Sequence, residues 1–235
     1  MISDILKKWC DENSITIDNK QLSDFEAYSS LLLEWNEKMN LTAITEESEV
    51  AVKHFIDSIS VLKCCEFPQG ARLIDIGTGA GFPGIPLKIM RPDIKLTLLD
   101  SLNKRLIFLD EVCKKIGTEA GLVHARAEEY GQKPDYRESC DIAISRAVAN
   151  LPALCEFCLP YVKVGGCFIS MKGPDGENEL KEAANAIKLL GGGKPEVKTL
   201  TLPDGSTRTI ISIRKLSPTP AKYPRRGVKI SKSPL

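Results

Sequence analysis

Carboxylates and glycines suited to ligand chemistry lie in two neighbouring segments of the chain. Asp75 falls inside the apolar run of residues 72–76, and a glycine-rich turn over residues 77–81 follows it. Asp100 ends the next apolar run, residues 95–100. Glycine lets a backbone approach a ligand without a Cβ in the way, and a carboxylate at the end of a second strand accepts hydrogen bonds from ribose hydroxyls. Together the two segments predict a site for a nucleoside ligand.

The spacing of the glycines separates two classes of nucleotide site. They lie at Gly77, Gly79 and Gly81, which is not the G-x-G-x-x-G spacing of a dinucleotide fold. The spacing is similar to that of S-adenosylmethionine-dependent methyltransferases, and this resemblance makes S-adenosylmethionine the expected cofactor. An ordinary strand-to-helix turn is the alternative interpretation of the glycines alone. The second acidic anchor, Asp100, argues against it.

Short apolar strands alternate with helical segments after residue 70. Strands are expected near residues 72–76, 95–100, 121–124, 140–145 and 166–171, and helices near residues 83–90, 102–116, 150–162 and 176–190. This alternation predicts an α/β fold whose parallel sheet is covered by helices on both faces. Residues 197–202 and 207–213 flank a Pro-Asp-Gly turn and predict a closing β-hairpin.

Two helices are expected before the sheet. One covers residues 18–39 with Asp18 as its N-cap, and the other runs from about residue 46 to residue 64. Pro68-Gln69-Gly70 marks the junction with the main domain. We therefore predict a helical extension over residues 1–67, a main domain over residues 68–216 and a basic, Pro-containing tail over residues 217–235 that is extended as far as Arg226.

Composition narrows the class of protein. A chain of 235 residues with 43% hydrophobic side chains is long enough for one large domain. No apolar run approaches the ~20 residues that span a bilayer, and the first residues lack the apolar core of a signal peptide. We therefore expect a cytoplasmic protein without membrane contact, whose eight cysteines are reduced. Cys155 and Cys158 have metal-ligand spacing without a second pair, so no metal is predicted.

The formal net charge of +1 hides a strong asymmetry along the chain. Eight basic residues and no acidic ones lie between Ser206 and Leu235. This end is a candidate contact for a polyanion. A solvated, partly disordered tail is the alternative that charge alone leaves open.

Several separated segments match one family. They are residues 35–42, 53–58, 77–86, 98–101, 144–147, 171–173 and 222–225. In this order they resemble the bacterial 16S rRNA (guanine-N7) methyltransferases of the RsmG family, formerly called GidB. The resemblance implies a Rossmann-like class I methyltransferase with a seven-stranded, mostly parallel sheet that ends in an antiparallel hairpin. It also implies methylation of one guanine in the 530 loop of 16S rRNA, an activity whose loss is associated with low-level streptomycin resistance.

The resemblance assigns a set of site residues. The expected cofactor contacts are Asp75, Gly77, Gly79, Phe82, Asp100, Ser101, Leu102, Ala127, Glu128 and Arg146. Arg146 and Lys172 follow the fourth and fifth strands and are expected to position the target base. Guanine N7 carries no proton to remove, so no general base is required. Core packing of Phe82, a surface position for Glu128 and a structural ion pair for Arg146 remain open alternatives.

The expected partner is 16S rRNA, within the small ribosomal subunit, and the expected protein is a monomer. The predicted RNA contacts are Lys222, Tyr223, Arg225 and Arg226, with further phosphate contacts from Lys229 and Lys232. Tyr223 either stacks on an unpaired base or packs back onto the domain. His54 and Asp57 share the second helix and His124 ends the third strand, and their roles are left open.

Three other functions compete with this interpretation. A methyltransferase acting on a small metabolite shares the cofactor site but does not explain the basic end. An RNA-binding assembly factor without catalysis conflicts with the intact acidic and glycine positions of the two ligand segments. A nicotinamide oxidoreductase conflicts with the glycine spacing.

Overall fold

Seven strands of the described residues, 2–235, form one mixed sheet in the computed structural model. The strands are β1 (Arg72–Ile76), β2 (Lys95–Asp100), β3 (Gly121–His124), β4 (Cys140–Arg146), β5 (Val162–Lys172), β6 (Glu196–Thr201) and β7 (Thr207–Arg214). Their order is β3-β2-β1-β4-β5-β7-β6, and β7 runs antiparallel to both of its neighbours. The predicted parallel sheet with a closing antiparallel hairpin is confirmed. β5 begins at Val162, earlier than expected.

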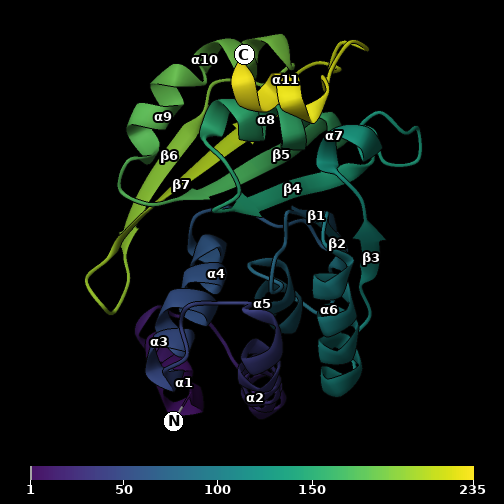
Figure 1. Cartoon of the computed structure of the whole chain (residues 1–235). Helices are drawn as coiled ribbons and strands as arrows, with labels where there is room; N and C mark the ends of the chain where they lie inside the picture. Colours follow the sequence, from purple (N-terminus) through teal and green to yellow (C-terminus); the bar gives the residue numbers. More distant parts are fainter. Residues whose placement is uncertain (1) are drawn as a thin grey trace.

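Helices cover both faces of the sheet, so the molecule has three layers (Figure 1). One layer contains α1 (Ile2–Glu12), α2 (Asn19–Met39), α3 (Glu47–Val50), α4 (Asp57–Ser60), α5 (Gly84–Met90) and α6 (Asn103–Ile116). The other contains α7 (Ala127–Tyr130), α8 (Leu151–Cys158), α9 (Gly176–Glu182), α10 (Ala184–Leu189) and α11 (Gly227–Lys232). Leu73 and Ile74 belong to different hydrophobic cores, because successive side chains of a strand point to opposite faces.

The two predicted N-terminal helices begin near the expected residues, but α1, which precedes them, was not predicted. Asp18 caps α2 in a capping box, in which the backbone N–H of Gln21 donates to Asp18 and the Gln21 side chain accepts from the Asp18 backbone. The predicted second helix is one helical run in four pieces: α3, the π-helical η1 (Ala51–Ile56), α4 and the 3-10 turn η2 (Val61–Lys63). The predicted helices over 150–162 and 176–190 are also divided, the first into α8 and the 3-10 turn η3 (Leu159–Tyr161), the second into α9 and α10.

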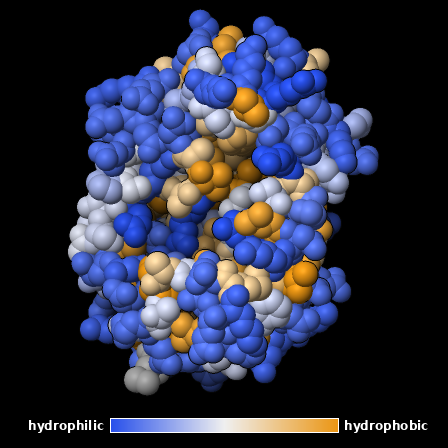
Figure 2. All heavy atoms as spheres, in the orientation of Figure 1, coloured by the Kyte–Doolittle hydropathy of each residue, from blue (hydrophilic) through white to orange (hydrophobic). Residues whose placement is uncertain are grey.

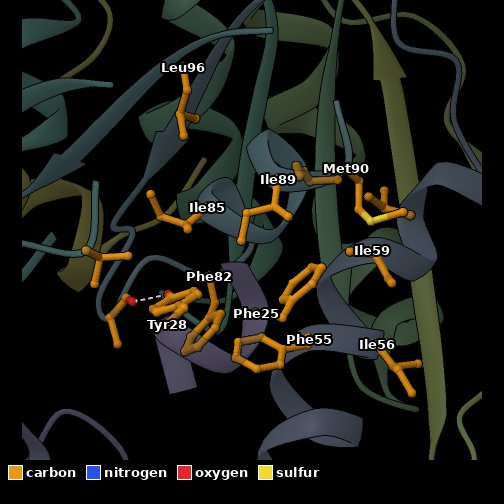
Figure 3. Close-up of a cluster of buried hydrophobic side chains, with 14 of the residues drawn as sticks. Phe25, Tyr28, Phe55, Ile56, Ile59, Phe82, Ile85, Ile89, Met90 and Leu96 are labelled. Carbon is orange, nitrogen blue, oxygen red and sulfur yellow. Dashed lines mark hydrogen bonds between the residues drawn. The ribbon is translucent and has the colours of Figure 1, made fainter. Parts of the chain in front are cut away.

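Aromatic side chains join the N-terminal helices to the sheet. Phe25 and Tyr28 of α2 pack with Phe55 of η1 and with Phe82, which follows the glycine-rich turn (Figure 3). The Tyr28 hydroxyl donates a hydrogen bond to the Ala80 carbonyl of that turn. The helices therefore support the turn directly. The predicted division of the chain at residue 67 stays a prediction.

The tail packs against the domain. Its residues 217–226 were predicted to be extended rather than helical; they contain no helix but include a turn at residues 221–222, and the short helix α11 follows them. Tyr223 is 6% exposed and belongs to the core beneath α8. Arg225 donates to both carboxylate oxygens of the fully buried Glu156, from Nε at 2.9 Å and from a terminal nitrogen at 2.8 Å. This charged, bidentate contact is of the strong class and fixes the tail to α8.

Glu156→Ala tests how the tail is held. Removing one partner of a buried ion pair leaves the other charge uncompensated, so we expect the free energy of unfolding to fall by about 3 kcal/mol. Trypsin is expected to cut the variant faster after Arg225 and Arg226. Chemical denaturation and timed proteolysis measure the two effects, and Glu177→Ala on the exposed surface of α9 is the control. Unchanged cleavage and stability would contradict this role.

Candidate active site

The glycine-rich turn follows β1 in a backbone conformation that favours glycine. Gly77 and Gly79 have φ angles of +70° and +61°. The backbone N–H of Gly77 donates to the Leu99 carbonyl at 2.8 Å, so the turn is fixed to the end of β2. A Cβ on Gly77 would lie 2.6 Å from the Val148 side chain, and one on Gly79 would meet no atom closer than 4.0 Å. Gly79 therefore leaves room for a ligand beside the backbone.

Asp75 lies beneath this turn. Its side chain is fully buried, and Oδ2 accepts hydrogen bonds from the Thr78 hydroxyl at 2.7 Å and the Gly84 backbone N–H at 2.9 Å. Oδ1 has no hydrogen-bond partner among the described residues. Burial raises the pKa of Asp75 to about 6. The carboxylate therefore shapes the turn from below, and its predicted cofactor contact stays a prediction.

Asp100 lies at the end of β2 with both carboxylate oxygens directed at nearby loops. Oδ2 accepts from the Gly79 backbone N–H at 2.9 Å and from Arg105 at 3.2 Å. Oδ1 accepts from the Leu102 backbone N–H at 2.8 Å. A carboxylate has lone pairs for further donors. Asp100 therefore couples the glycine-rich turn to the start of α6 and keeps capacity for ligand hydroxyls.

A cavity of about 390 Å³ opens beside these residues, and we call it the first cavity. It is lined by Leu41, Thr42, His54, Gly77, Thr78, Gly79, Ala80, Phe82, Asp100, Ser101, Arg105, Arg146, Ala147 and Val148. Its volume lies in the range of small-molecule sites. Six of the predicted cofactor contacts meet here, and Asp75 lies below them. A larger cavity of about 660 Å³ lies at the opposite edge of the sheet, where the strands begin, and contains none of these residues.

Four predicted contacts do not line the first cavity: Asp75, which lies below it, and Leu102, Ala127 and Glu128. Leu102 is the N-cap of α6 and is 42% exposed. Ala127 accepts a hydrogen bond from the Tyr161 hydroxyl at 2.7 Å through its carbonyl. Glu128 packs against Gly227 of the tail, where a Cβ would lie 2.1 Å from its carboxylate oxygen. Their predicted contacts with the cofactor stay predictions.

Phe82 is at once part of the core and part of the cavity wall. Its ring is stacked on His54 with centroids 4.4 Å apart, and it is 6% exposed. The guanidinium of Arg146 lies 5.0 Å from the ring centroid, within the range of a cation–π contact. Phe82 therefore packs in the core and also lines the first cavity, and its predicted contact with the cofactor stays a prediction.

Arg146 is held by a buried ion pair at the end of β4. One terminal nitrogen donates to Asp57 at 2.8 Å and to the Lys53 carbonyl at 3.1 Å. Asp57 is 3% exposed and also accepts from Nε of Arg208 at 3.0 Å. The sequence left the role of Asp57 open and offered no signal for Arg208, which reaches the site from the start of β7.

His54 is a neutral member of the same cluster. Burial, together with the neighbouring Arg146 cation, lowers its pKa to about 3. Nδ1 faces Arg146 at 3.4 Å and therefore accepts, so the proton resides on Nε2, which donates to the Thr42 hydroxyl at 2.8 Å. His54 and Thr42 lie in two of the segments that carry the family resemblance, and this resemblance was the only signal for them in the sequence.

Lys172 lies beside a second cavity of about 450 Å³. This second cavity is lined by Lys53, His54, Asp57, Arg146, Ala147, Met171, Lys172, Gly173, Glu179 and Arg208. The two cavities share His54, Arg146 and Ala147. Ala147 has a φ of +56°, an uncommon conformation for a residue with a Cβ that is often found at functional sites. Figure 2 shows that the molecule is hollowed near the middle of this face, between the two helical layers.

The predicted RNA contacts divide into two groups. Lys222 and Arg226 are exposed, as are Lys229 and Lys232 of the tail. Tyr223 is buried and Arg225 is paired with Glu156. Of the two alternatives for Tyr223, the structure therefore shows packing onto the domain. The four exposed cations remain accessible to a polyanion.

No group of three or more His, Cys, Asp or Glu residues suited to a metal ion occurs within residues 2–235. Cys155 and Cys158 are free thiols, fully buried in α8, and burial raises the pKa of each. No helix in the same range combines the length and apolar character needed to cross a membrane.

The chain is similar to several known proteins. The family model GidB, described as rRNA small subunit methyltransferase G, matches residues 21–210. A ribosomal RNA small subunit methyltransferase G of Alkaliphilus metalliredigens (strain QYMF) is 52% identical over 233 residues, 98% of each chain. Its counterpart in Alkaliphilus oremlandii (strain OhILAs) is 51% identical over 237 residues, covering 100% of this chain and 99% of the relative.

A solved structure shows the same fold at low identity. The SAM-dependent O-methyltransferase from Thermotoga maritima superposes with a TM-score of 0.52 at 15% identity, covering 80% of this chain and 73% of that chain. The expected class I methyltransferase fold is confirmed.

The protonation of His54 is testable by pH titration. Because the folded pKa is about 3, we expect its imidazole NMR signals to stay constant between pH 5 and pH 8. Below about pH 6.5 the unfolded chain binds a proton that the folded protein does not, so this group lowers the free energy of unfolding by about 1.4 kcal/mol per pH unit. His124→Gln leaves a single histidine for assignment. A His54 midpoint near 6.5 would contradict the buried, neutral state.

Proposed function

The chain belongs to the rRNA small subunit methyltransferase G family, and from this premise we propose that it transfers a methyl group from S-adenosylmethionine to N7 of a guanine in the 530 loop of 16S rRNA. The family inferred from the sequence segments is confirmed, and the protein is a SAM-dependent rRNA small subunit methyltransferase. The observation that supports the cofactor part of this proposal is the first cavity, where the glycine-rich turn, Asp100 and Arg146 meet, and the target guanine is proposed from the family resemblance.

The residues present fit the cofactor. Gly79 leaves open space beside its backbone, which a Cβ would fill, and Asp100 offers carboxylate lone pairs at the same wall. We assign the ribose hydroxyls to Asp100, the adenosine to Ser101 and Leu102, and the adenine edge to Ala127 and Glu128. Gly77, Gly79 and Phe82 border the methionine portion, with Asp75 fixing the turn from below. When bound, S-adenosylmethionine supplies an electrophilic methyl group on a sulfonium cation.

No residue of the site has to remove a proton. Guanine N7 exposes a lone pair, so the protein contributes mainly proximity and orientation. His54 matches this requirement, because Arg146 and Thr42 occupy its two ring nitrogens and its pKa of about 3 keeps it neutral. A hydrogen bond from Arg146 to guanine O6 would orient the base.

In our proposal Lys172 positions the target base, either indirectly through the residues that it holds or by donating a hydrogen bond to guanine O6. Its ammonium group donates to the Ala149 carbonyl at 2.6 Å and pairs with Glu179 at 2.7 Å. These contacts hold the loop after β4, which contains Ala147. In our proposal Lys172 therefore positions the loop at the junction of the two cavities.

The exposed cations of the tail are proposed to engage rRNA phosphates. They are Lys222, Arg226, Lys229 and Lys232. Arg225 supports them by fixing the tail to the buried Glu156. We further propose that the protein acts as a monomer on the small ribosomal subunit, and therefore in the cytoplasm.

Transfer of labelled methyl groups tests the proposal. Small subunits from a strain without this modification are incubated with the protein and labelled S-adenosylmethionine, and the product nucleoside is identified by mass. We expect 7-methylguanosine in a fragment that contains the 530 loop. Label in another nucleoside or another fragment would overturn the proposed target.

Asp100→Ala tests the cofactor assignment. Loss of one charged hydrogen-bond acceptor removes about 1.5–3 kcal/mol, so we expect the Kd for S-adenosylmethionine to rise roughly tenfold to a hundredfold. Isothermal titration calorimetry measures the change. Asp110→Ala on the solvent side of α6 is the matched control. An unchanged Kd in the Asp100 variant would refute the ribose assignment.

A further inference from the structure

The second cavity has an excess of positive charge. Its wall contains four cationic side chains, Lys53, Arg146, Lys172 and Arg208, and two carboxylates, Asp57 and Glu179. His54 adds no charge, because its pKa is about 3. A site with this charge and an opening to solvent favours an anionic ligand. It adjoins the first cavity through Arg146, so a ligand here lies next to whatever occupies that cavity.

Most of these cations are already bound to the protein. Lys172 is 8% exposed and engages Ala149 and Glu179. Lys53 is paired with Glu49. Arg146 directs its contacts at Asp57, Lys53 and His54.

Arg208 differs from the others. Its Nε donates to Asp57 and one terminal nitrogen donates to the Thr207 carbonyl at 3.1 Å. The second terminal nitrogen has no hydrogen-bond partner among residues 2–235. The side chain is 20% exposed, so this nitrogen is accessible while the guanidinium is held in place. A fixed guanidinium with free donors suits a phosphate group.

We propose that the second cavity receives the target nucleotide, with its base toward Arg146 and its phosphate on Arg208. This inference rests on the proposed function, because it takes the acceptor to be a nucleotide of RNA. Arg146 belongs to both cavities, whereas Arg208 lines only the second, on the other side of Asp57. The base therefore occupies the end nearest the cofactor site, and the phosphate occupies the far end.

Asp57 is the positioning residue of this arrangement. Its Oδ2 holds Arg146 and its Oδ1 holds Arg208, so a single buried carboxylate sets the separation of the two guanidinium groups. Both contacts are between side chains at most 20% exposed, where solvent screening is reduced. The opposite wall is fixed by Glu179, which pairs with Lys172 and accepts from the Leu151 backbone N–H.

Substitution of Arg208 tests the proposal by direct RNA binding. The probe is a fluorescent RNA hairpin that carries the 530-loop sequence, titrated with the full-length protein at several salt concentrations. We expect Arg208→Ala to weaken binding about tenfold and to lower the slope of log K against log salt by about 0.7–0.9, the value for one phosphate contact. Arg208→Lys should keep the slope and lose part of the affinity, because the charge remains without the planar fork.

The control variant is Arg214→Ala, which removes an exposed arginine from the far end of the same strand. Its slope and affinity should match the wild type. S-adenosylmethionine binding, measured by calorimetry, should stay within about twofold in all three variants, and thermal melting verifies folding. An Arg208→Ala variant with the wild-type salt slope would overturn the inference. A loss of S-adenosylmethionine affinity as large as the loss of RNA affinity would also overturn it, because it would indicate collapse of the Asp57 cluster.

The proposed function and the proposed nucleotide site can be refuted independently of each other. If the wild type methylates its subunit substrate but RNA binding is indifferent to Arg208, the nucleotide site is wrong and the proposed function stands. If the wild type methylates another base while the salt slope still depends on Arg208, the proposed target is wrong and the nucleotide contact stands.

Discussion

The buried carboxylate of Asp57 is the constraint on which the site depends. A buried, ionised acid is unfavourable unless it is paired and hydrogen-bonded. Here it is paired with Arg146 and Arg208, which lie 89 and 151 positions away in the chain. The N-terminal helical run, the end of β4 and the start of β7 must all be in place to satisfy it. The ion pairs thereby join the N-terminal helical layer to two strands of the sheet.

Because the site depends on contacts between distant parts of the chain, only its locally determined features could be predicted from the sequence. The positions of the strands and the capping of α2 follow from local patterns, namely short apolar runs and an Asp-x-x-Gln start, although the early start of β5 was not predicted. The glycine-rich turn and Asp100 are also local, because each lies at the end of its own strand. Arg208 was missed, since its place beside Arg146 arises only when the hairpin pairs with β5.

The tail shows a second limit of sequence reasoning. Its charge identified it as a candidate contact for a polyanion, and four of its cations are exposed. A count of charges does not reveal that Arg225 is directed into the protein, because its partner Glu156 lies 69 residues earlier in a helix with an otherwise apolar surface. Similarly, the Glu128 side chain packs on the tail at Gly227, so the loop after β3 and the tail are in direct contact.

Two adjoining cavities share Arg146, and we propose that one holds the cofactor and the other the acceptor nucleotide. A crystal structure with S-adenosylhomocysteine and guanosine 5′-monophosphate tests this most directly. We expect the ribose of the first ligand at Asp100, the guanine of the second beside Arg146 and its phosphate on Arg208. A nucleotide bound elsewhere, with the cavity between Arg146 and Arg208 free of ligand, would contradict the account.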